Sequence, residues 1–371
     1  MIRLTRPETG GAAEAIASVL KDGYLVQGRQ VGCFERQVAD FVGRGHAVAV
    51  SSGTAALQAA LWALGVGPGD EVIVPDFTFP ATANAAVACG ATPVLADIDL
   101  ATFNIDVASV RACLSPRTRA VMPVDLFGLA CDLGSMGGLV AERGLFLVED
   151  SACALGSAFR GRKCGSFGDA SIISFHPRKI VTTGEGGMVL TDDQALADRV
   201  RTLRNHGIDV SAEHRGFVVA GLNLRMNEIE ACLGLAQMEG LEGFIQRRRA
   251  VARQYGKLLD GLAEITAPVE PSGCFHTYQA YVVLIDPRID RDRLIAALAA
   301  EGIETAIGTY AVHLQPYYRD LPGAAQVRLT QSEYAFRHSL ALPIYPSMGE
   351  DLVEAVVAGL KKCLPLCRTE A

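Results

Sequence analysis

The chain has 371 residues, 50% of them hydrophobic and 20% charged, which suits one large domain and a smaller one. Its 34 Lys and Arg against 41 Asp and Glu give a net charge of −7, and no basic block points to nucleic acid or an anionic membrane as partner. No apolar run is long enough to span a bilayer, and the N-terminal segment lacks the apolar core of a signal peptide. We therefore expect a cytoplasmic protein that acts on small molecules.

The ten cysteines are scattered along the chain, which is typical of free thiols in a reducing compartment. Cys363 and Cys367 form the closest pair, but no second pair and no histidine lies near them in the sequence. Their spacing is that of neighbours on one helix face. We therefore expect no metal site.

The first half of the chain alternates short β-branched runs with helix-like stretches, as in an α/β layered fold. The runs at 72–74 and 145–148 are apolar at every residue, which is typical of parallel strands covered on both faces. Ligands of such sheets bind at the carboxyl ends of the strands. The predicted strands lie within 46–52, 70–76, 92–99, 119–128, 145–150 and 170–175.

From about residue 194 the pattern becomes helical, and a long helix beginning near residue 227 is expected to join the large domain to a second one. After Pro268 a strand-like run at 278–285 is followed by a helix-like stretch, an irregular stretch from Gly308 to Ala325 and a final capped helix. The expected division is a large domain over 1–245 and a small C-terminal α/β domain over 246–371.

Three patterns at predicted strand ends carry the chemistry. In "SSGTAAL" a strand passes through Gly53 and Thr54 into a helix, whose first amides can bind a phosphate, although such residues often only cap the helix. Asp150 ends the apolar run "LFLVED", where it can serve as a cap, a salt-bridge partner or the counter-ion of a protonated ring nitrogen. Lys179 follows "ASIISF" in a glycine-rich loop, where desolvation makes an amine a usable nucleophile.

Pyridoxal 5′-phosphate (PLP) uses all three features, because it needs a lysine for its Schiff base, an acid for its ring nitrogen and an anion site for its phosphate. Phe79, after the second predicted strand, can supply an apolar plate for the ring, although it can equally be a core aromatic. No glycine-rich nucleotide motif competes for these strand ends.

Several collinear motifs resemble the DegT/StrS family of sugar aminotransferases, from about Leu4 to beyond Pro346. That family has the type I fold of PLP-dependent transferases, with a mostly parallel central sheet flanked by helices in the large domain. The motifs are "SSGTAALQAAL", "GPGDEVIVPDFTFPATANA", "VEDSACALGS", "SFHPRKIVTTGEGG", "LRNHG" and "GLNLRMNEIEACLGLAQM".

The resemblance implies a role for each matching residue. Lys179 would bind PLP covalently and shuttle the proton, while Asp150 would pair with the ring nitrogen. Phe79 would stack on the ring, and Asn223 would reach the phosphate from the second subunit of a homodimer. The phosphate would also be held by Gly53, Thr54, Ala55 and Ser174.

Two departures from the family pattern concern the pocket. Cys153 stands where many members have His or Gln near the ring hydroxyl, and a thiol is a weaker donor. In the C-terminal part, Gly308 and Thr309 stand where many members have His followed by Tyr or Phe. Tyr310 and His313 are candidates for substrate contact or for simple loop packing.

The expected reaction is amino transfer from L-glutamate or L-glutamine to a keto-sugar, most plausibly a nucleotide-linked keto-deoxysugar, by a ping-pong mechanism. A cyclitol or another non-nucleotide ketone is an alternative acceptor. Lys179 argues against the deoxysugar dehydratases of this fold, in which histidine replaces the lysine. A non-catalytic regulatory protein is the remaining alternative, although both the lysine and the acid are present.

Overall fold

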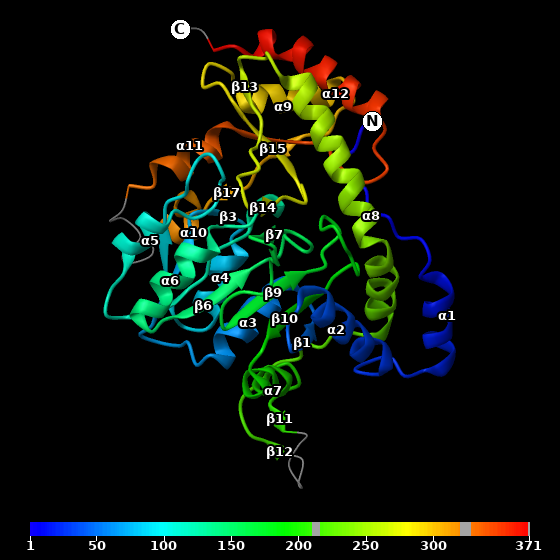
Figure 1. Cartoon of the computed structure of the whole chain (residues 1–371), viewed down its shortest axis with the longest axis vertical. Helices are drawn as coiled ribbons and strands as arrows, with labels where there is room; N and C mark the ends of the chain where they lie inside the picture. Colours follow the sequence, from blue (N-terminus) through cyan, green and yellow to red (C-terminus); the bar gives the residue numbers. More distant parts are fainter. Residues whose placement is uncertain (210–215, 320–327, 370–371) are drawn as a thin grey trace.

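A seven-stranded sheet forms the centre of the computed structural model, which describes residues 1–209, 216–319 and 328–369 (Figure 1). Its order is β1-β10-β9-β6-β5-β2-β4, and β10 runs antiparallel to both neighbours while the other pairs are parallel. The predicted α/β fold with a mostly parallel sheet is therefore confirmed. The strands are β1 (His46–Val50), β2 (Glu71–Pro75), β4 (Thr92–Ala96), β5 (Thr118–Val121), β6 (Phe146–Asp150), β9 (Ala170–Ser174) and β10 (Gly187–Thr191).

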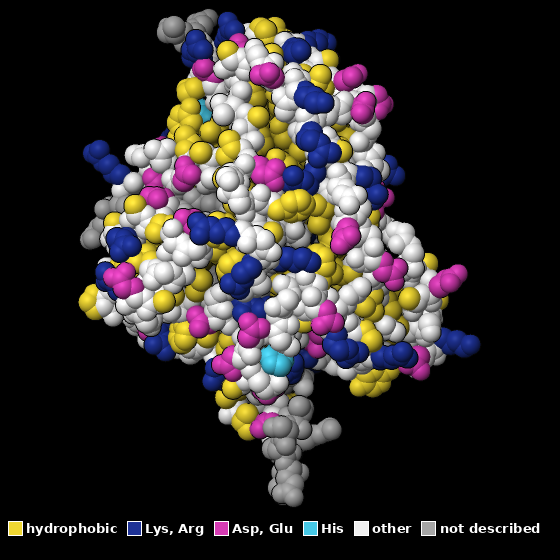
Figure 2. All heavy atoms as spheres, viewed as in Figure 1, with side chains coloured by type: hydrophobic (Ala, Val, Ile, Leu, Met, Phe, Trp, Pro, Cys, Tyr) yellow, Lys and Arg dark blue, Asp and Glu magenta, His cyan; other side chains and the backbone are white. Residues whose placement is uncertain are grey.

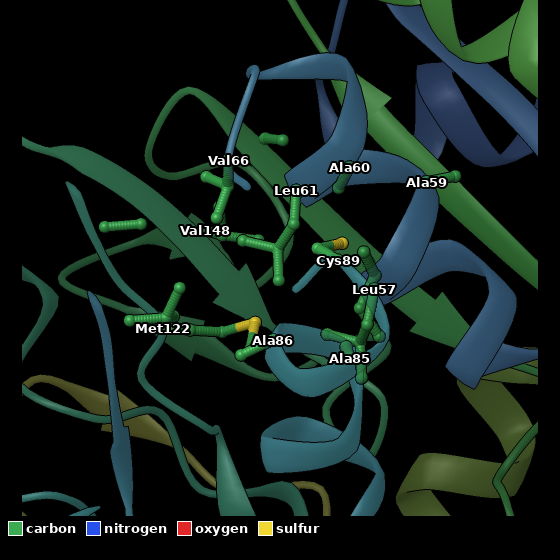
Figure 3. Close-up of a cluster of buried hydrophobic side chains, with 14 of the residues drawn as sticks. Leu57, Ala59, Ala60, Leu61, Val66, Ala85, Ala86, Cys89, Met122 and Val148 are labelled. Carbon is green, nitrogen blue, oxygen red and sulfur yellow. The ribbon is translucent and has the colours of Figure 1, made fainter. Parts of the chain in front are cut away.

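Helices cover both faces of this sheet because successive strand residues point to opposite sides. Val72 and Val74 of β2 pack on the side of α3, α4 and α7, whereas Ile73 packs on the side of α5 and α6. Figure 3 shows the first of these cores, with Leu61 of α3 next to Met122 and Val148 of the sheet side. These helices are α2 (Arg29–Val42), α3 (Gly53–Ala63), α4 (Ala81–Ala88), α5 (Val107–Cys113), α6 (Leu133–Arg143) and α7 (Gln194–Leu203).

The long helix α8 (Glu228–Leu259) packs against two hydrophobic cores in turn. Its residues up to Ile245 join the core beneath α2, whereas those from Val251 onward join the core of the C-terminal part. Its N-terminus has a capping box formed by Asn227 and Glu230. The division at residues 245 and 246 stays a prediction.

The C-terminal part is built on an antiparallel sheet of order β13-β15-β18-β16. The last helix has Gly349 at its N-cap and no side-chain cap, so the expectation of a capped helix was wrong in that detail. The elements are β13 (Ile265–Thr266), β15 (Tyr281–Ile285), β16 (Ala306–Ile307), β18 (Ser339–Leu342), α9 (Arg291–Ala300), α11 (Thr330–His338) and α12 (Glu350–Cys363).

None of the described helices is long and apolar enough to cross a membrane. Several short helices, turns and strands complete the described chain. Within the stretch expected to be irregular, β17 pairs with β3, while residues 320–325 lie outside the described residues. The short elements are α1 (Ala13–Asp22), β3 (Phe77–Thr78), the 3-10 turn η1 (Leu126–Gly128), β7 (Ala158–Phe159), β8 (Arg162–Lys163), β11 (Ile208–Asp209), β12 (Gly216–Phe217), β14 (Cys274–Phe275), β17 (Tyr310–Ala311), η2 (Val312–Leu314), α10 (Pro316–Arg319) and η3 (Leu364–Cys367).

Candidate active site

A cavity of about 580 Å³ lies where the large-domain strands end against the C-terminal part. Four residues that the sequence assigned to the candidate site, Ala55, Asn223, Tyr310 and His313, are not among its lining residues. The wall on the C-terminal side includes Gly308 and Thr309, the two residues that depart from the family pattern. The cavity brings together the predicted site residues Gly53, Thr54, Phe79, Asp150, Cys153, Ser174 and Lys179.

Lys179 lies in the loop between β9 and β10, where its amide donates to the carbonyl of His176 at 2.8 Å. Its Nζ donates to the Sγ of Cys153 at 3.0 Å. At the end of this loop, a Cβ on Gly187 would lie 2.2 Å from the carbonyl oxygen of Ser52, so only glycine fits there. Gly187 thus allows the end of the lysine loop to pack against the turn that precedes α3.

Asp150 ends β6 with only 3% of its surface exposed. Its carboxylate accepts hydrogen bonds from the Thr82 hydroxyl at 2.9 Å and from the Ala152 amide at 3.2 Å. Burial raises the pKa of Asp150, while these two bonds and the charge of Lys179 oppose the rise. Since no described cation forms an ion pair with it, a protonated ring nitrogen fits this carboxylate chemically.

The N-terminus of α3 forms the anion-binding end of the cavity. Ser52 is the N-cap, and its hydroxyl accepts a hydrogen bond from the Ala55 amide at 3.1 Å. The amides of the first helical turn have no carbonyl one turn earlier to bind, so those of Gly53 and Thr54 can donate to a phosphate. Ser174 is packed directly on this turn, because a Cβ on Gly53 would lie 2.8 Å from the Cβ of Ser174.

Phe79 presents its ring to the cavity with 62% of its surface exposed, which argues against a core aromatic. The ring of Tyr310 contacts it edge-on, with the centroids 6.3 Å apart. An exposed aromatic ring beside a buried acid and an amine is suited to hold a flat, charged heterocycle such as PLP.

His313 is held by Asp76, whose side chain is fully buried at the end of β2. The Nδ1 of His313 lies 2.6 Å from one carboxylate oxygen, and the amide of His313 donates to the other at 2.7 Å. Burial lowers the pKa of His313, but the hydrogen bond and charge of Asp76 outweigh it and raise the pKa overall. This pair fastens the chain after β17 to the large domain, which favours packing over substrate contact.

Asn223 is exposed, and its backbone forms an isolated antiparallel bridge with Asn205. It does not line the cavity of its own chain. Its predicted contribution from a second subunit stays a prediction.

Sequence reasoning missed several residues of the cavity. Thr82 supports Asp150 from the first turn of α4, and only the tertiary fold brings the two together. His176, Arg178 and Gln279 also line the cavity. For Arg178 a signal existed, namely a second cation directly before the lysine.

Comparison with known proteins supports the chemistry of the site. The family model described as the DegT/DnrJ/EryC1/StrS aminotransferase family matches residues 8–361. The GDP-perosamine synthase of Caulobacter vibrioides is 40% identical over 340 residues, which cover 91% of each chain.

Two solved structures extend the likeness to the fold. A structure of DesI in the presence of its TDP-sugar product has a TM-score of 0.90 at 36% identity, covering 98% of this chain and 92% of that one. The PLP form of Spr1654 from Streptococcus pneumoniae, described as a putative sugar aminotransferase, has a TM-score of 0.92 at 26% identity, covering 99% and 100%. The chain therefore belongs to the DegT/DnrJ/EryC1/StrS family of sugar aminotransferases and is a PLP-dependent aminotransferase.

Proposed function

We propose that this chain transfers an amino group from L-glutamate or L-glutamine to a nucleotide-linked keto-deoxysugar by a ping-pong mechanism. The observation that carries the proposal is one cavity that joins the amine of Lys179, the buried carboxylate of Asp150 and the amino-terminal turn of α3. A lysine, an acid and an anion site in one cavity are the groups that a protein needs to bind and activate PLP.

Each side chain then has a definite task. Lys179 supplies the amine that binds the cofactor and, when released, moves a proton to and from the substrate carbon. The thiol of Cys153 accepts a hydrogen bond from that amine and holds it on the cavity side of the loop. Asp150 keeps a ring nitrogen protonated, and the first amides of α3 hold the phosphate. The bound cofactor supplies the electron sink.

The acceptor proposed for the second half-reaction is a sugar nucleotide. The names of the GDP-perosamine synthase and of DesI with its TDP-sugar product support this class. The cavity wall on the C-terminal side is made mostly of small and apolar residues, with Thr309 and Gln279 as its polar residues, which suits the ring of a deoxysugar.

A homodimer with shared active sites completes the proposal. Asn223 lies outside the cavity of its own chain and is exposed, so it is free to contribute to the cavity of a partner subunit. An isolated subunit is then expected to be inactive, and the protein is expected to work in the cytoplasm.

Transfer of a labelled nitrogen tests the function directly. PLP-loaded protein is incubated with L-glutamate or, separately, L-glutamine labelled with ¹⁵N at the α-amine, together with a panel of GDP- and TDP-linked keto-deoxysugars, keto-cyclitols and simple ketones. The expected result is a nucleotide-linked amino sugar whose amine carries the ¹⁵N label, which gives it a higher mass than the product formed from an unlabelled donor. Transfer only to a keto-cyclitol or a simple ketone would replace the proposed acceptor, and no transfer from either labelled glutamate or labelled glutamine would refute the proposal.

A further inference from the structure

Arg178 is the second cation of the cavity besides Lys179, since the other described lining residues include no further Lys or Arg. Its side chain is exposed to solvent at the cavity. The acids among the same lining residues are Asp150 and Glu185, and the described ion pairs include none between either of them and Arg178. The guanidinium is therefore available to an anionic ligand.

The backbone of Arg178 is fixed on both sides, unlike that of an ordinary surface arginine. Its amide donates to the Nδ1 of His176 at 3.2 Å, and its carbonyl accepts from the Nε2 of Gln279 at 2.7 Å. Pro177 further restricts the chain just before it. Because this backbone is already fixed, ligand binding by Arg178 does not carry the entropy cost of ordering it.

His176 adds an uncharged donor to the same wall. Because its Nδ1 accepts the amide of Arg178, its ring proton lies on Nε2. Burial lowers the pKa of His176, which keeps the ring neutral at physiological pH. The two side chains together offer a planar guanidinium and an N–H donor, a combination suited to phosphate or carboxylate oxygens.

We infer that Arg178 is a specificity residue that binds the anionic group of a substrate whose reacting carbon lies at Lys179. The choice of ligands rests on the proposed function, in which the acceptor carries a diphosphate and the donor carries an α-carboxylate, joined by a second carboxylate when the donor is L-glutamate. The two sources share the chemistry of an oxyanion, and a ping-pong enzyme presents both to the same cavity. Arg178 directly precedes Lys179 in the chain, and both line the same cavity, so a ligand that reacts at Lys179 occupies the cavity that Arg178 lines.

Calorimetry on the PLP-loaded protein tests the inference without requiring turnover. GDP is titrated as the diphosphate probe and glutarate as the dicarboxylate probe, into the wild type, Arg178→Met, Arg178→Lys and Arg143→Met. Arg143 is an exposed arginine on α6 outside the cavity, so its variant is a matched control. Arg178→Met is expected to weaken at least one probe about tenfold or more, Arg178→Lys less, and the control not at all.

The two arms identify the source of the anion. Weaker binding of GDP assigns Arg178 to the acceptor, and weaker binding of glutarate assigns it to the donor. Unchanged affinity for both probes in Arg178→Met, or an equal loss in Arg143→Met, would overturn the inference. Since neither probe reacts, failure of amino transfer would count against the proposed function alone.

Discussion

The two ends of the active-site cavity differ in how deeply their residues are buried and how closely they are packed. At the cofactor end, Asp150 is almost completely buried, and Gly53 and Gly187 stand where a Cβ would collide with a neighbouring segment. At the substrate end, Arg178 is exposed, and the wall near Thr309 comes from a short strand and loop of the C-terminal part. Close packing leaves the first region little room to change, whereas the exposed Arg178 in the second can be replaced without disturbing the core. Under the proposed function, we therefore expect the chemistry to depend on the first end and the substrate selectivity on the second.

The largest effect is expected at the cofactor end, from Lys179→Ala. Loss of the amine removes both the covalent partner of PLP and the proton shuttle, so turnover should fall at least about 1,000-fold. The rate at which L-glutamate bleaches the visible absorbance of PLP-loaded protein measures it. Lys257→Ala, an exposed lysine on α8, is the control and should bleach normally. An active Lys179→Ala variant would contradict the role of the lysine.

Asp150→Asn should separate activity from stability. Without the negative charge the ring nitrogen loses its proton, and turnover should fall about 100-fold. Because burial raises the pKa of Asp150, its ionised form costs folding free energy above that pKa. Removal of the charge should therefore leave the thermal midpoint of the PLP-free protein at pH 7 unchanged or higher. A loss of activity that merely follows a lower midpoint would mean that Asp150 has only a structural role.

Hybrid dimers sharpen the comparison by asking whether the cofactor end needs two chains. Lys179→Ala and Asn223→Ala are each expected to be impaired alone. When they are mixed after partial unfolding, half of the dimers should carry one intact site, which restores about a quarter of wild-type turnover. Failure of the mixture to exceed its parents, with mixed dimers verified by mass spectrometry, would exclude a contribution of Asn223 across the interface.

The smallest effect on catalysis is expected from His313→Ala. The substitution removes the imidazole from the buried carboxylate of Asp76 and leaves it the backbone amide at this position, which should cost about 2 kcal/mol of stability. Asp76 raises the pKa of His313, so the stabilisation is present below the ordinary pKa of histidine and is lost as the pH rises through the raised value.

Thermal melts at several pH values and steady-state kinetics check this prediction. The difference in thermal midpoint between wild type and variant should shrink with rising pH, while the KM values change little. A large rise in KM at unchanged stability would instead support direct substrate contact by His313.

The cofactor end could be predicted from the sequence because its residues lie directly at strand ends. Asp150 follows an apolar strand, Gly53 opens a helix and Lys179 stands in a glycine-rich loop, so local patterns are enough to bring them to one edge of the sheet. The layered fold followed from the same alternation of strands and helices.

Contacts that join distant segments could not be predicted in this way, at either end of the cavity. Thr82 meets Asp150, and Asp76 meets His313, only after the chain has folded. Tyr310 and His313 were candidates for substrate contact because they follow Gly308 and Thr309, which depart from the family pattern. In the structure Tyr310 instead flanks Phe79, and His313 binds Asp76. Arg178 was overlooked because the neighbouring lysine already explained the loop.

Identification of the residue that binds PLP covalently is the most direct test of the proposed chemistry. The purified protein is loaded with PLP, reduced with borohydride and digested, and the modified peptide is sequenced by mass spectrometry. We expect one modified residue, Lys179, and a smaller modified fraction when L-glutamate is added before the borohydride. A label on another lysine, or no label on a protein that otherwise folds, would contradict the proposed chemistry.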